Sequence, residues 1–132
     1  MIKRTIKIGR WVVDFLFATK DYDVDGALAS LYDAGASEDV LERAESLMEG
    51  CRYNCGFTFG NPRRMRAVVM IGPTSSGAEF QDTLVHEIHH LAVVIASNLG
   101  IDLEGEWPAY LSGDTMREFA DVVCRLGCPE CH

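Results

Sequence analysis

Residues 76–100, SGAEFQDTLVHEIHHLAVVIASNLG, decide the fold because they predict one long amphipathic helix. Ser76 and Glu79 form a capping box, the Ser-x-x-Glu pattern that satisfies free amides in the first turn of a helix. Gly100 is a suitable C-terminal cap. Between them, apolar residues recur at steps of three and four and so share one face: Phe80, Leu84, Ile88, Leu91 and Ile95. The sequence therefore predicts a helix from about Gly77 to Leu99.

Two β-hairpins are expected before this helix, because strand-favouring runs alternate there with turn residues. The four expected strands are residues 2–8, 11–18, 57–59 and 65–71. Further helices are expected over residues 24–34, 37–48 and 107–126. With 132 residues, the chain has the length of one domain. We therefore predict a single α+β domain over residues 1–132, a small N-terminal sheet of two hairpins with packed helices.

Composition and charge argue against three classes of protein, namely nucleic-acid-binding, membrane and secreted proteins. A net charge of −8 is the wrong sign for a non-specific nucleic-acid binder, so we expect no nucleic-acid partner. The longest apolar runs are too short to cross a bilayer, so no membrane partner is expected either. Arg10 and Asp14 interrupt the apolar N-terminal stretch, which argues against a signal peptide. An odd number of cysteines, five, fits a reducing compartment better than a disulfide framework, and we predict a cytoplasmic protein.

The long helix carries the pattern His-Glu-x-x-His at residues 86–90. Residues four apart lie on one helical face, so His86 and His90 can bind a single zinc ion. Glu87 lies about 100° around the helix, close enough to accept a proton from a zinc-bound water. His89 is expected to be no ligand, although His86 and His89 are also neighbours on a helix. The alternative is an ordinary helix with a polar surface.

A catalytic zinc site needs a third protein ligand and an open position for water. The predicted helix continues about 13 Å past His90, and an extended link can return a similar distance. That return favours Glu104 or Glu106, while Asp114 could support a ligand histidine or replace Glu106.

Residues 82–121 resemble zincin metallopeptidases of the gluzincin kind, in which the third zinc ligand is a glutamate at the start of the next helix. Small members carry a Glu-x-x-Ala pattern there, and Glu106 and Ala109 match it. The segments HEIHHLAVVIASNLGID and GEWPAYLSGD are similar to short predicted zinc peptidases of phages and mobile elements. The resemblance implies a minimal zincin-like fold, a catalytic zinc held by His86, His90 and Glu106, and a peptide or protein substrate.

The resemblance also implies that an edge strand near the metal pairs with extended substrate. Residues 65–71 stand in the corresponding place in the chain, and the alternative is that they form an interior strand.

The cysteines support two weaker hypotheses. Cys51, Cys55, Cys128 and Cys131 could hold a second, structural zinc. Cys128-Pro129-Glu130-Cys131-His132 has the form of a c-type haem attachment motif, which would require export. We expect free cysteines instead.

The sequence thus favours a zinc-dependent metallopeptidase with Glu87 as general base. The rival hypothesis is a non-catalytic zinc-binding module for protein interaction, of phage or mobile-element origin. A structural zinc site would not need Glu87.

Overall fold

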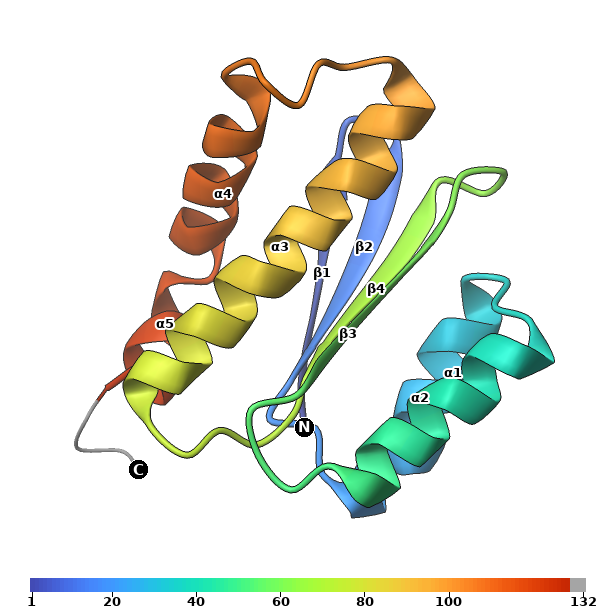
Figure 1. Cartoon of the computed structure of the whole chain (residues 1–132), viewed down its shortest axis with the longest axis vertical. Helices are drawn as coiled ribbons and strands as arrows, with labels where there is room; N and C mark the ends of the chain where they lie inside the picture. The colour runs from blue at the N-terminus through green and yellow to red at the C-terminus, as the bar shows by residue number, and fades with distance from the viewer. Residues whose placement is uncertain (129–132) are drawn as a thin grey trace.

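The computed structural model describes residues 1–128, which form one mixed β-sheet with helices on both faces (Figure 1). A turn of 3₁₀ helix over Asp21–Asp23 follows the first hairpin. The other elements, in chain order, are β1 (Ile2–Ile8), β2 (Trp11–Phe17), α1 (Val24–Asp33), α2 (Glu38–Gly50), β3 (Gly56–Asn61), β4 (Arg66–Ile71), α3 (Gly77–Leu99), α4 (Trp107–Glu118) and α5 (Ala120–Leu126). The expected α+β class is confirmed.

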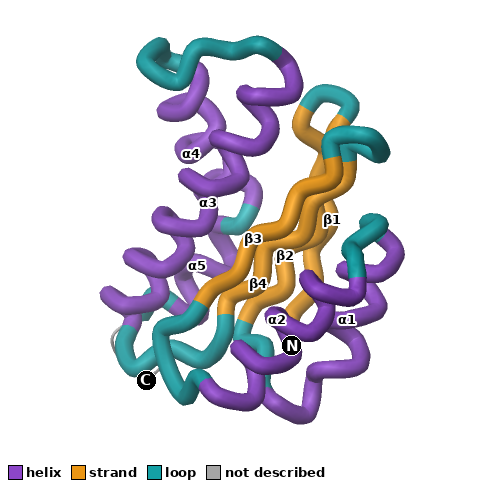
Figure 2. The backbone as a smooth tube through the Cα atoms, turned by 45° about the vertical axis from the view of Figure 1, so that its right-hand side comes forward, coloured by secondary structure: helices purple, strands orange, loops and turns teal. Residues whose placement is uncertain are grey.

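The strand order is β1-β2-β4-β3, so the two hairpins lie side by side (Figure 2). β1 and β2 are antiparallel, as are β3 and β4. β2 and β4 are parallel, with a register that runs from Val12 opposite Arg66 to Leu16 opposite Met70. The connection between these parallel strands runs through α1, α2 and β3, and α1 and α2 cover one face of the sheet (Figure 1).

The expectation that residues 65–71 form an edge strand is wrong. β4 pairs with β2 on one side and with β3 on the other, and β3 has the free edge. The continuous buried run from Ala67 to Ile71 explains this position, since only a strand covered on both faces is apolar at every residue.

The sheet separates two hydrophobic cores, and β2 contributes to both because its side chains alternate between faces. Trp11, Phe15 and Phe17 pack with α3, α4 and α5 in the larger core. Leu16 packs with α1 and α2 on the opposite face. β2 is an interior strand, paired with β1 and β4, and it buries large side chains on both faces. No helix among residues 1–128 has the length and hydropathy needed to cross a bilayer.

Helix α3 begins and ends as the sequence predicts. The Ser76 hydroxyl accepts a hydrogen bond from the amide of Glu79 at 3.1 Å, and Gly100 ends the helix in the left-handed region with φ of 70°. The last expected helix, residues 107–126, is instead two helices, because Phe119 leaves helical geometry at φ −103° and ψ 25°. Phe119 is buried, with its ring centroid 4.7 Å from that of Phe15.

Candidate metal centre

Two imidazoles converge on the exposed side of α3. His86 and His90 lie one helical turn apart, and their Nε2 atoms are 3.1 Å apart. A tetrahedral zinc ion with bonds of 2.0–2.1 Å separates two ligand nitrogens by about 3.3 Å. The two side chains therefore have the spacing that one ion requires, without a change in the helix.

Glu87 points in another direction, into the contact between α3 and β3. It is 5% exposed, a rare position for a carboxylate unless it has a partner. Its partner is the Thr58 hydroxyl, which donates to Oε1 at 2.9 Å. The other oxygen, Oε2, lies 4.0 Å from Nε2 of His86. Thr58 thus holds one carboxylate oxygen, and the second faces the imidazoles.

Within residues 1–128, His86, Glu87 and His90 are the one group of three metal-ligating side chains whose ligand atoms all lie within 4.8 Å of one another. Both imidazoles are exposed and the carboxylate is buried. A metal ion held by the two exposed imidazoles would have its remaining coordination positions towards solvent, and a catalytic site requires at least one open position.

Glycines in β3 allow this close approach of strand and helix. A Cβ atom at Gly56 would lie 2.6 Å from Cγ and 2.8 Å from Oε2 of Glu87, distances too short for real contacts. A Cβ at Gly60 would collide with the side chain of Val94. Sequence reasoning missed these residues, although residues 56–60, GFTFG, place small residues at every second position and so on one face of a strand.

The site opens into a depression of about 380 Å³ beside the free edge of β3. It is lined by Gly56, Phe57 and Thr58 of β3 and by His86, Glu87, His90, Val93 and Val94 of α3. An edge strand has unpaired backbone amides and carbonyls. The imidazoles therefore lie next to a strand edge that can accept another extended chain.

The residues predicted as a third ligand lie elsewhere. Glu106 is the exposed N-cap residue of α4, and neither it nor Glu104 belongs to the histidine group. Asp114 accepts a hydrogen bond from Arg117 at 3.3 Å and lines a groove between α4 and β1. β1 and β3 are opposite edges of the sheet, three strand spacings or about 14 Å apart. The groove that Asp114 lines thus includes the sheet edge opposite to the one beside the histidines. That Glu106 is a zinc ligand stays a prediction.

The cysteines are not arranged as expected. Cys51 and Cys55 are joined in a disulfide, so the expectation of free thiols is wrong for this pair. Among the residues that the structure describes, no cysteine belongs to a group of three metal-ligating side chains of cysteine, histidine or carboxylate type. Cys131 and the rest of the haem-like motif beyond Cys128 lie outside the described residues.

No protein-family model, curated protein or solved structure matched the chain. The resemblance to zincins therefore rests on the His86-Glu87-x-x-His90 cluster and on the sequence around it. What the structure establishes is a small α+β fold with a cluster of two histidines and one glutamate that could hold a metal ion.

Proposed function

We propose that the protein is a zinc-dependent metallopeptidase, with His86 and His90 as zinc ligands and Glu87 as general base. One observation carries this proposal: a buried carboxylate, held by Thr58, faces two imidazoles at the correct spacing beside a free strand edge. A purely structural zinc site would gain nothing from a buried carboxylate that is not a ligand.

Zinc at this position would lower the pKa of a coordinated water and polarise a peptide carbonyl. The protein's own part is to move the proton. Because Thr58 donates to Oε1 of Glu87, the oxygen that faces His86 is Oε2, which accepts the proton. Glu87 then returns this proton to the leaving amine, so the carboxylate acts first as base and then as acid.

The substrate in this proposal is an extended peptide or protein segment that pairs with β3. Addition of a strand to a free sheet edge aligns a substrate through backbone hydrogen bonds, whatever its side chains are. At β3 such a strand would run past His86 and His90, which share a depression with Gly56, Phe57 and Thr58. The free edge supports β3, rather than residues 65–71, as the strand that pairs with an extended substrate.

Substitution of Glu87 by Gln tests the chemistry, since it keeps the shape of the side chain and removes the base. We expect Glu87→Gln to bind as much zinc as the wild type and to hydrolyse peptides about 10² to 10⁴ times more slowly. Both quantities are measured on protein purified without chelator, by metal analysis and with a fluorogenic peptide library. Undiminished hydrolysis by this variant would remove Glu87 from the mechanism.

The third ligand is tested by zinc content per chain. The pattern Glu-x-x-Ala favours Glu106, so Glu106→Ala should lose zinc while Glu104→Ala and Asp114→Ala, as matched controls, keep it. Loss of zinc in one of the controls instead would assign the ligand to that residue. Full zinc in all three variants would indicate a site of two histidines completed by Glu87 or by water.

None of the acidic residues predicted as a third ligand belongs to the histidine group, and this favours a second candidate, a non-catalytic zinc-binding module for protein interaction. This candidate predicts zinc binding that depends on His86 and His90 and no hydrolysis by the wild type. The same library therefore separates the two functions, because only the peptidase shows cleavage that Glu87→Gln abolishes.

A further inference from the structure

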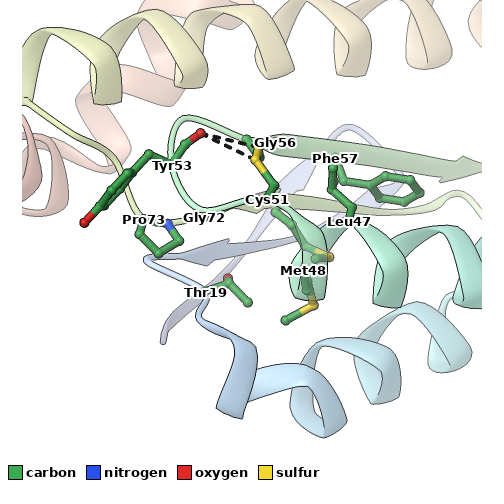
Figure 3. Close-up of a pocket in the computed structure, with 11 residues that line it drawn as sticks. Thr19, Leu47, Met48, Cys51, Tyr53, Gly56, Phe57, Gly72 and Pro73 are labelled. Atoms are coloured by element: carbon green, nitrogen blue, oxygen red, sulfur yellow. Dashed lines mark hydrogen bonds between the residues drawn. A yellow bond between two sulfur atoms is a disulfide. The ribbon is translucent and has the colours of Figure 1, made fainter.

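The Cys51–Cys55 disulfide lies where α2 ends and β3 begins, and its two cysteines differ in their surroundings. Both line a small cavity of about 20 Å³, together with Tyr53 and Pro73 (Figure 3). Cys51, but not Cys55, also lines a surface groove of about 460 Å³. A reagent that enters from solvent through this groove therefore meets Cys51 first.

The loop between the two cysteines is held in place without the disulfide. Asn54 turns the loop back with φ of 64°, and its amide donates to the Pro73 carbonyl at 2.8 Å. The Gly72 amide donates to the Cys55 carbonyl, also at 2.8 Å. A cross-link between residues four apart closes a short loop, and short loops gain the least stability from a cross-link. The bond can therefore open and re-form while the backbone keeps the two sulfurs near each other.

The described lining of the groove beside Cys51 carries more positive than negative charge, although the chain as a whole has a net charge of −8. Its cations are Lys20 and Arg52, both exposed, and Glu49 opposes them. The Arg52 guanidinium lies 5.3 Å from the ring centroid of Tyr53, a contact that positions the cation without neutralising it. An anionic thiol is therefore attracted to this groove more strongly than a neutral one.

A surface disulfide that adds little to folding is typical of redox-active pairs. We propose that Cys51–Cys55 is a reversible redox site, and that a small anionic thiol of the glutathione class reduces it through this groove by attack on Cys51. In the first step the incoming thiolate forms a bond to Sγ of Cys51, the disulfide breaks, and its electron pair goes to Sγ of Cys55, which takes a proton from water. In the second step another thiolate attacks the sulfur of the bound thiol, which releases the oxidised dimer of the reductant and leaves Cys51 to take a proton.

The structure also provides a partner for the reduced form. The carbonyl oxygen of Tyr53 lies 3.4 Å from Sγ of Cys51 and 3.5 Å from Sγ of Cys55 (Figure 3). Either thiol can therefore donate a hydrogen bond to this oxygen once the disulfide is open.

The test needs no peptidase activity, because the groove, as far as residues 1–128 line it, includes no residue of the histidine cluster. The parent carries Cys124→Ser, Cys128→Ser and Cys131→Ser, so that Cys51 and Cys55 are its only cysteines. Cys55→Ser or Cys51→Ser then leaves a single thiol, and circular dichroism checks the fold. With oxidised glutathione, which runs the second step in reverse, Cys51 should form the mixed disulfide about tenfold faster than Cys55, as followed by intact mass.

In the parent itself, trypsin locates the attacked sulfur because it cleaves after Arg52, between the two cysteines. During reduction by excess glutathione, samples are quenched in acid and their free thiols are blocked. The glutathione adduct should lie on residues 44–52, which contain Cys51, and not on residues 53–63, which contain Cys55.

Charge variants of the parent test the groove. Lys20→Gln and Arg52→Gln should each slow reduction by glutathione about threefold and leave reduction by the neutral thiol 2-mercaptoethanol unchanged. Arg10→Gln, in the turn at the opposite end of the sheet, is the matched control and should react as the parent does. Equal reactivity of Cys51 and Cys55, an adduct mainly on residues 53–63, a disulfide that glutathione opens only after denaturation, or charge variants that react like the control would each overturn the proposal.

Discussion

Gly56 offers a direct test of how tightly the candidate base is held. In Gly56→Ala the new methyl group would lie 2.6 Å from Cγ of Glu87, whereas ordinary contacts are 3.4 Å or longer. The carboxylate must therefore move by about 0.8 Å, because the strand backbone on the other side is held by pairing with β4. A misplacement of about 1 Å costs a catalytic group on the order of 100-fold. We expect kcat/KM to fall roughly 10- to 100-fold, or about 1.4–2.8 kcal/mol in activation free energy.

The assay measures peptide hydrolysis and zinc content on the same preparations. Zinc content should stay at the wild-type level, because the three atoms nearest to a Cβ at Gly56 all belong to Glu87 and none to an imidazole. Gly113→Ala is the matched control, since a Cβ there meets nothing within 4 Å. This control should keep full activity and gain about 0.5–1 kcal/mol of stability from its better helix propensity.

Wild-type activity in Gly56→Ala would refute the reasoning, because it would mean that the position of the Glu87 carboxylate does not matter for hydrolysis. Loss of both zinc and activity would also contradict it, since the perturbation would then have reached the imidazoles. Absence of hydrolysis in the wild type would instead count against the peptidase proposal itself.

Two further predictions concern Thr58 and Asp121. Thr58→Val removes the hydroxyl that holds Glu87, so we expect kcat/KM to fall about tenfold at constant zinc content. Thr58→Ser keeps a hydroxyl and should keep both the wild-type rate and the zinc content. Equal rates for the two variants would contradict this role of Thr58. The Arg4 guanidinium, hydrogen-bonded at 2.8 Å, holds the pKa of the Asp121 carboxyl below its ordinary value of 3.8. This pair therefore contributes stability above pH 3.8 that is lost as the pH falls through the folded-state pKa. In an NMR titration Arg4→Gln should raise the pKa of Asp121 towards its ordinary value, and an unchanged pKa would show that Arg4 is not the cause.

Local signals in the sequence predict α3 and its histidine cluster well. The capping box at Ser76, the glycine after Leu99 and the apolar repeat are all short-range patterns, and each acts within one or two helical turns. The pairing of His86 with His90 follows from helix geometry alone, so it needs no tertiary contact to be predicted.

The remaining parts of the fold depend on contacts between distant segments. The break at Phe119 has no glycine or proline to announce it, because it arises where the ring packs against Phe15 in the core. The parallel pairing of β2 with β4 leaves β3 at the edge of the sheet. The continuous apolar run at residues 67–71 could have predicted that β4 is an interior strand. The partner of Glu87 likewise comes from β3, 29 residues earlier in the chain.

The alternation along β3 makes the register of the second hairpin part of the metal centre. Gly56, Thr58 and Gly60 face α3, while Phe57 and Phe59 face the core under α2. A slip of one residue between β3 and β4 would exchange these faces and bring two phenyl rings against Glu87. The turn at residues 62–65, at the far end of the strands, sets this register. We therefore expect a single-residue insertion there to disrupt the candidate site, although the amino acids of the histidine cluster would be unchanged.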